Sequence, residues 1–202
     1  STGAFTGGIS SSAGDAIFSG VEARQNGGFY AVGHYEDDSL GYRFNIDSTP
    51  FTSNGGDTVA LAYDGSSILW VRNSTVSSGA NHSHDSAVDV TVDGNGDIHV
   101  LGVILGDTVF GGNLLSFSGS QDMYVWTLAP SGSTKAVVSS NSAQSAEMPT
   151  TIVTNGEKLI VGGNFAGTLT IGEISPVVTP PASGAIQAGY VAQLRITGDS
   201  GT

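Results

Sequence analysis

The sequence contains no cysteine, which excludes a disulfide framework and any cysteine-based metal site. Basic residues are also scarce: 6 Lys and Arg stand against 18 Asp and Glu, giving a net charge of -12. A chain this acidic repels phosphate backbones and anionic lipid surfaces, so we expect neither nucleic acid nor inserted membrane as a partner. No apolar run approaches the roughly 20 residues needed to cross a bilayer.

Glycine and small hydroxyl residues are plentiful, while charged residues make up only 12% of the chain and glycine contributes 30 residues. This composition is typical of an all-β protein with many turns. The acidity fits a secreted protein or one displayed on a cell surface, and it fits simple solubility equally well. Because the sequence starts at Ser1 rather than Met, we expect a removed leader or a piece of a longer chain.

The stretch 85–138 shows the pattern most clearly. Short runs of alternating apolar residues are separated by turn residues, as in the Asp93-Gly-Asn-Gly-Asp97 segment. Alternation with a period of two, broken by Gly-rich turns, predicts strands joined by hairpins. The stretch therefore predicts one four-stranded antiparallel sheet.

Two further copies of this pattern align with the first. Their second strands carry glycines at 33, 102 and 163, about 60 to 70 residues apart, a period typical of propellers and other arrays. A glycine inside a strand predicts a bulge or a close backbone approach at each of these positions. The expected third strands are 57–63, 122–128 and 189–196, and the expected fourth strands are 68–71 and 135–138.

The repeat boundaries leave one strand at each end of the pattern. The predicted organisation is a closing strand over 1–14 and repeats over 15–80, 81–143 and 144–202. The third repeat stops before a fourth strand, and residues 4–12 resemble one. In a propeller, this offset lets one blade take strands from both chain ends and leaves no unpaired edge.

These copies resemble the bacterial β-propeller repeat family, the SBBP-type repeats of secreted and surface proteins. The matching residues are Val92 to Gly102, Phe110-Gly111 and Ser118 to Leu128, and the looser copies extend the resemblance over nearly the whole chain. The third copy has Gly189 where Asp is expected. The resemblance implies propeller-type blades and a secreted or surface location, and it implies little about activity.

Three repeats are fewer than the four to eight blades of known propellers. Two chains would give a six-bladed ring with C2 symmetry, the chain could be part of a longer repeat protein, or strands could be exchanged head to tail in a filament. A β-trefoil or β-prism is the alternative fold.

Two segments are candidate metal sites. Asp93, Asn95 and Asp97 place oxygen-bearing side chains at alternate positions, as at the start of a calcium loop, although Ile104 excludes a complete EF-hand. The alternative interpretation is a hairpin turn. His82, His84 and Asp85 form the only histidine cluster and could bind zinc, copper or nickel, or they could be a polar loop.

Two Asn-x-Ser/Thr sequons, at Asn73 and Asn81, predict glycosylation if the source organism modifies secreted proteins. Catalytic patterns are weak: there is no nucleophile elbow, and the acid pair Asp37-Asp38 lies in a predicted loop. An extracellular polysaccharide hydrolase or lyase, and a lectin-like carbohydrate-binding module, are therefore alternatives.

The favoured hypothesis is a non-catalytic, structural or adhesive module that binds copies of itself or neighbouring repeats. Exposed sheet edges are templates for pairing with another chain. We expect the self-contact on the first and last strands, at Ala4, Phe5, Tyr190, Val191 and Leu194.

Overall fold

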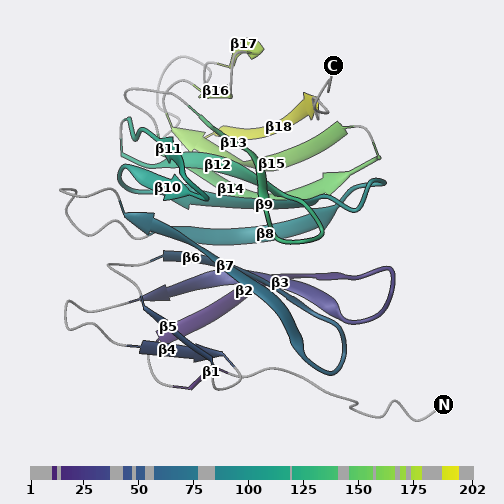
Figure 1. Cartoon of the computed structure of the whole chain (residues 1–202). Coiled ribbons are helices and arrows are strands. Elements are labelled where there is room, and N and C mark those ends of the chain that lie inside the picture. Colours follow the sequence, from purple (N-terminus) through teal and green to yellow (C-terminus); the bar gives the residue numbers. More distant parts are fainter. Residues whose placement is uncertain are drawn as a thin grey trace.

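The computed structural model describes most of the chain. The described residues are 11–12, 15–36, 43–46, 49–52, 57–76, 85–118, 120–140, 146–156, 158–166, 169–171, 174–178 and 188–195. Every regular element in these ranges is a β-strand, so the prediction of an all-β protein is confirmed. Three antiparallel sheets, one for each sequence repeat, lie above one another in a stack (Figure 1).

Each of the three sheets is a meander in which neighbouring strands follow one another along the chain, apart from the inserted hairpins. The first sheet contains β2 (Asp15–Ala23), β3 (Phe29–Glu36), β6 (Asp57–Tyr63) and β7 (Ile68–Val76). The second contains β8 (Ser86–Val92), β9 (Ile98–Ile104), β12 (Asp122–Leu128) and β13 (Thr134–Ser139). The third contains β14 (Ala146–Thr154), β15 (Lys158–Ala166) and β18 (Ala188–Arg195). The predicted four-strand order is thus present in the first two repeats.

A short hairpin is inserted between the second and third strand of each repeat. These hairpins are β4 (Arg43–Ile46) with β5 (Thr49–Thr52), β10 (Thr108–Phe110) with β11 (Asn113–Leu115), and β16 (Leu169–Ile171) with β17 (Ile174–Val178). Strand β10 pairs with the end of β7, so the hairpin of the second repeat extends the first sheet. Strand β4 pairs in the same manner with the short strand β1 (Ser11–Ser12).

The three in-register glycines sit opposite β-bulges, as predicted. Gly33, Gly102 and Gly163 each lie across from the point where the register of the first strand shifts. A Cβ atom at these positions would collide with the carbonyl oxygens of Ile17, Ser86 and Met148, respectively. The bulge therefore requires a residue without a side chain, which explains the spacing in the sequence.

Alternation along the strands sorts side chains into two cores between the sheets. On β9, Val100 faces the first sheet and Leu101 the third. Strand β8 packs against β2 and β3, and β14 packs against β8 and β9. The middle sheet is therefore covered on both faces, while the first and third sheets each turn one face away from the stack.

The register of β18 corrects one sequence alignment. Tyr190 pairs with Gly163, as Tyr124 pairs with Gly102 and Val59 with Gly33. Ala188, rather than Gly189, therefore occupies the position of Asp57 and Asp122. The error arose because a short alternating strand looks similar when it is shifted by one residue, although the shift exchanges the two faces.

None of the three sheets closes into a barrel or ring within the described residues. In this part of the chain β18 pairs only with β15, and Ser11–Ser12 pair with β4 at the other end of the stack (Figure 1). A closed propeller, and the completion of the last sheet by the N-terminal strand, therefore stay predictions.

Candidate assembly site

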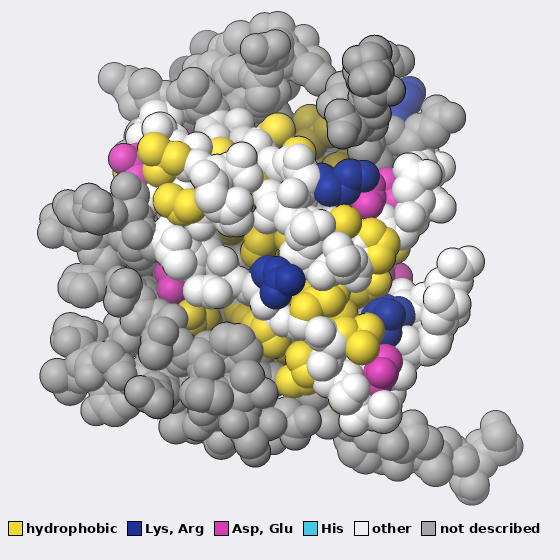
Figure 2. Space-filling view, in the orientation of Figure 1, with side chains coloured by type: hydrophobic (Ala, Val, Ile, Leu, Met, Phe, Trp, Pro, Cys, Tyr) yellow, Lys and Arg dark blue, Asp and Glu magenta, His cyan; other side chains and the backbone are white. Residues whose placement is uncertain are grey.

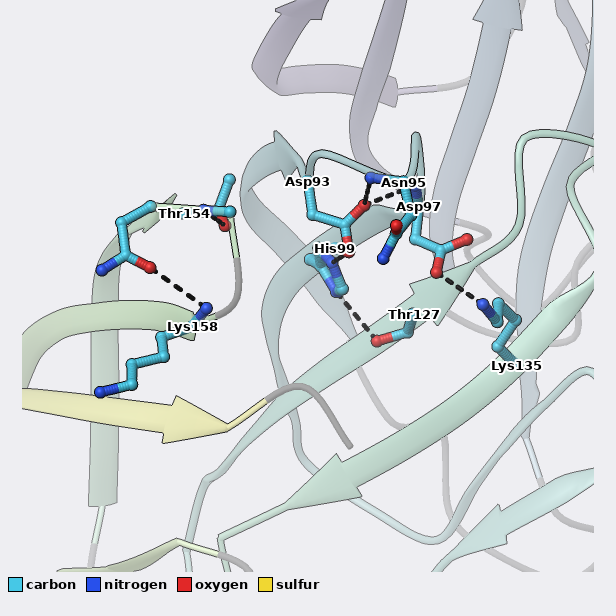
Figure 3. A network of polar contacts seen from close by, with 10 residues as sticks. Asp93, Asn95, Asp97, His99, Thr127, Lys135, Thr154 and Lys158 are labelled. Atoms are coloured by element: carbon cyan, nitrogen blue, oxygen red, sulfur yellow. Dashed lines mark hydrogen bonds and ion pairs between the residues drawn. The ribbon is translucent and has the colours of Figure 1, made fainter. Parts of the chain in front are cut away.

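The predicted calcium segment forms the turn between β8 and β9. Oδ1 of Asp93 accepts the backbone N–H groups of Asn95 at 2.8 Å and Asp97 at 3.0 Å (Figure 3). The N–H of Asp93 in turn donates to the carbonyl oxygen of Asp97 at 3.0 Å. The Asp93 carboxylate thus folds back over its own backbone, which is the usual role of Asp in a turn.

The remaining oxygens of this turn contact neighbouring strands. Oδ2 of Asp93 lies 3.3 Å from Nε2 of His99, and Nδ1 of His99 lies 3.0 Å from Oγ1 of Thr127. Burial lowers the pKa of His99, against the opposing effect of Asp93, so the imidazole is neutral at pH 7. Oδ2 of Asp97 accepts a hydrogen bond from Nζ of Lys135 at 2.6 Å. The network therefore connects the turn to β9, β12 and β13.

Calcium binding at Asp93, Asn95 and Asp97 stays a prediction. The ion would have to replace backbone N–H groups at Asp93 and the ammonium of Lys135 at Asp97. The corresponding turn of the third repeat uses neutral side chains for the same purpose: Oδ1 of Asn155 accepts the N–H of Lys158 at 3.2 Å (Figure 3). No group of three or more His, Asp or Glu side chains in the described ranges has an arrangement suited to a metal ion.

Several predicted site residues lie outside the described residues: Ala4, Phe5, Asn81, His82 and His84, together with the acid pair Asp37-Asp38. Asp85 is described and is buried in a different network. Asn73 is half-buried, and its Nδ2 donates to the carbonyl oxygen of Ser74 at 2.9 Å. Glycosylation of Asn73 stays a prediction, and a glycan on this nitrogen would have to be accommodated beside β7.

A buried serine–carboxyl contact joins the first and second sheets. Oγ of Ser74, at the end of β7, accepts the N–H of Thr58 at 2.9 Å and lies 3.5 Å from Oδ2 of Asp85. The same Asp85 oxygen accepts the hydroxyl of Thr108 at 2.7 Å. Burial, with a smaller contribution from the charge of Asp57, raises the pKa of Asp85 to about 7, although the Thr108 hydrogen bond opposes this.

The second junction repeats this geometry at equivalent positions. Oγ of Ser140 accepts the N–H of Met123 at 2.9 Å and donates to Oε2 of Glu147 at 3.0 Å. Asp122 lies at the start of β12, as Asp57 does in β6, and accepts the N–H of Ser118 at 2.7 Å. Each junction thus contains a serine at or directly after the end of a fourth strand, beside an acid at the start of the next repeat.

Sequence reasoning missed these junctions because their acids stand next to turns, where Asp and Glu are common. The four carboxyl side chains are in fact buried, with exposed fractions of 0–1%: Asp57, Asp85, Asp122 and Glu147. The available signal was the recurrence of an acid at the start of a strand together with a serine at the end of a fourth strand. Because these four carboxyl groups are closed off from solvent, they are suited to joining repeats and unsuited to acting on a substrate.

The outward face of the third sheet is exposed and carries two valine side chains among polar residues. Val191 is 79% exposed, although Val125 and Ala60 hold the same register position in the other sheets and are 2% and 1% exposed. Val153 on β14 is 50% exposed on the same face. In the first two repeats this face is buried by the following sheet.

The outward face of the first sheet is open over β2 and the start of β3. Val21 is 67% exposed, whereas its register equivalents Val90 and Ile152 are 3% and 2% exposed. The surface there forms a hollow of about 250 Å³, whose lining residues are Phe18, Ser19, Gly20, Val21, Phe29 and Ala31. Over β6 the same face is buried at Val59, Leu61 and Tyr63. On β3 this face is also buried, at Ala31 and Tyr35, so the opening is confined to β2 and the start of β3.

The predicted self-contact residues on β18 divide between two surfaces. Tyr190 is buried against the second sheet, and Leu194 packs on the same core, so their side chains face inward. Val191 faces outward. On the side of the stack seen in Figure 2, the described residues carry few charges, and hydrophobic side chains reach the surface between isolated basic and acidic groups.

A scan against protein-family models and a search of curated proteins both found no match for this chain. The resemblance to SBBP-type repeats therefore stays an expectation from the motifs. The described part of the chain contains no helix with the length and apolarity that membrane crossing requires.

Proposed function

We propose that this protein is a non-catalytic structural module, secreted or displayed on a cell surface, that assembles end to end with copies of itself. In this assembly the third sheet of one copy covers the open part of the first sheet of the next. The observation that carries the proposal is Val191, which is 79% exposed at a position where the other sheets are 1–2% exposed. In the first two repeats the following sheet covers the equivalent residue. We therefore expect a sheet of the same kind to cover Val191.

The two open faces match in chemistry. Val153 and Val191 present branched apolar groups on the third sheet, and Phe18 and Val21 line the hollow on the first sheet. Joining the faces removes apolar surface from water, which is the dominant favourable term in association. The new contact continues the interfaces already present between sheets one and two and between sheets two and three.

This contact is heterologous, because it joins different faces of two identical chains. Such contacts form a ring if the rotation between copies closes, and an open filament if it does not. Two copies would give the six-sheet ring expected from the repeat count. Continued addition would give a fibre suited to a structural or adhesive role.

The test places a charge on one face at a time, in Val21→Glu and Val153→Glu variants, and measures absolute mass by light scattering over a wide range of concentration. Wild type should form dimers or larger species, and each variant alone should be monomeric because an unpaired carboxylate would be buried at the contact. A mixture of the two variants should form dimers and nothing larger, since one intact face remains on each.

The matched control is Leu105→Glu, in the bend that follows β9 of the middle sheet, where Leu105 is 39% exposed and lies on neither outward face. This variant should assemble as wild type does. A wild-type protein that stays monomeric at every concentration would overturn the proposal, as would equal loss of assembly in the control.

A further inference from the structure

Among the described strands, none pairs with the outer edge of the third sheet, where the first two sheets have a fourth strand. Strands β6 and β12 each pair with two strands, whereas β18 pairs only with β15 among the described strands. An unpaired row of N–H and C=O groups is a template for another strand. The position next to β18 corresponds to the fourth strand of the first two repeats.

Each fourth strand is fixed to its third strand by the serine described above. Ser74 accepts the N–H of Thr58, and Ser140 accepts the N–H of Met123, both at 2.9 Å. The corrected register places Gly189 at this donor position in the third repeat. A strand added beside β18 is therefore expected to bring a serine opposite the N–H of Gly189.

Ser11 occupies the position of such a serine at the start of the chain. Ser74 pairs with Phe110, the last residue before the two-residue turn of the β10–β11 hairpin. Ser11 pairs with Ile46, the last residue of β4, which in turn pairs with Thr49 at the start of β5. In both places a serine-bearing strand is extended by the hairpin of the repeat that follows.

We propose that residues 4–12 of one copy form the fourth strand of the third sheet of a neighbouring copy, with Ser11 accepting the N–H of Gly189. This inference rests on the proposed end-to-end assembly and specifies how the assembly is locked. The β4–β5 hairpin then extends the neighbour's third sheet, just as β10–β11 extends the first sheet within one chain. Backbone pairing of this kind is strand addition to an exposed edge.

The register of the added strand follows from β12 and β13. Val125 pairs with Val138, two residues before Ser140, and Val191 is the equivalent of Val125. Counting two residues back from Ser11 places Ile9 opposite Val191. Residues 4–10 lie outside the described residues, and only their sequence enters this assignment.

The absence of cysteine makes a disulfide test specific. Ile9→Cys and a mass-tagged Val191→Cys variant are mixed, oxidised and separated on non-reducing gels. Paired positions on neighbouring antiparallel strands lie within the Cα separation that a disulfide tolerates. The mixed dimer should form at least about tenfold faster than with Ser10→Cys in place of Ile9→Cys, because assembly holds only the first pair at high effective concentration.

The outcomes separate this inference from the proposed function. Equal cross-linking of positions 9 and 10, or no cross-linking in a sample that light scattering shows to be assembled, would overturn strand donation and leave face-to-face assembly standing. A cross-link within one chain in a protein carrying both cysteines would also overturn it. Absence of assembly by light scattering would remove the proposed function and this inference together.

Discussion

The two junctions between sheets are built from different side chains. The first is aromatic: the ring of Phe110 lies 4.7 Å from that of Tyr124 and 5.1 Å from that of Trp126, centroid to centroid. The second is mainly aliphatic, with Leu101, Val161 and Ile152 at its centre. Among its described residues Phe165 and Tyr190 form an aromatic pair whose ring centroids are 6.1 Å apart.

The outer strands sharpen this contrast. In the first junction Nε1 of Trp70 donates to the carbonyl oxygen of Pro130 at 2.9 Å, and Nε of Arg72 donates to that of Gly132 at 2.8 Å. The register equivalents of Trp70 and Arg72 on β13 are Ala136 and Val138, which have no such reach. Contacts from both inner and outer strands therefore stabilise the first junction, whereas contacts from the inner strands mainly stabilise the second. We infer that the third sheet separates first when the stack is stressed.

The largest predicted effect is at the first junction. Trp126→Ala should lower the free energy of unfolding by about 3–5 kcal/mol, because it removes a fully buried indole and leaves a cavity. The substitution also removes the hydrogen bond that Nε1 of Trp126 donates to Oγ1 of Thr134 at 3.0 Å. Chemical denaturation followed by far-ultraviolet circular dichroism measures the loss.

The matched comparison is the preceding residue on the same strand. Val125 faces the second junction and is 2% exposed. Val125→Ala should cost only about 1–2 kcal/mol, from the loss of two buried carbons at ~0.8 kcal/mol each. Equal losses for the two variants would contradict the view that the first junction carries more of the stability.

The second prediction concerns the pH dependence of stability, which Asp85 should confer on the first junction. The folded-state pKa of Asp85 is raised to about 7 from its ordinary 3.8, so the folded chain retains a proton that the unfolded chain releases. The contribution of Asp85 to stability is therefore complete below about pH 4 and is lost as pH rises through 7. The expected slope in this window is at most about 1.4 kcal/mol per pH unit.

Asp85→Asn removes this titration and should flatten the stability profile between pH 4 and 7. Asp64 provides a control of opposite sign, because hydrogen bonds from the backbone of Ser67 and Ser66 lower its pKa to about 2. Asp64→Asn should alter the profile only on the acid side, below about pH 4. An unchanged slope in Asp85→Asn would show that Asp85 is ionised in the fold and that its burial is relieved by another group.

The sequence predicted the strands and the glycine register because both follow from local rules. Alternation marks a strand with one face on each core, and a glycine opposite a bulge is required by sterics. The orientation of Tyr190 was not predictable in this way. A strand shifted by one residue keeps its alternation but exchanges its faces, and only the pairing with Gly163 decides between the two.

The self-contact at the strand edges stays a prediction from the sequence, and the buried junctions were not predicted. Strand edges as contact points followed from the repeat count, since an array ends in unpaired edges. The buried junction acids did not, because Asp85 and Glu147 look like turn residues until the next sheet covers them. Burial by a sheet that lies far away in sequence is a property of the stack, and no local pattern contains it.

The smallest predicted difference is the one between the two junction serines. Ser140→Ala should cost about 1–3 kcal/mol in free energy of unfolding, because a buried N–H at Met123 and a carboxyl oxygen of Glu147 both lose this partner. Ser74→Ala should cost less, by about 1 kcal/mol. Its contact to Asp85 is 3.5 Å long, and Asp85 keeps the 2.7 Å hydrogen bond from Thr108. Equal losses of free energy in the two variants would mean that each serine stabilises its junction through the backbone N–H that it accepts, and that its contact with the carboxyl group adds little.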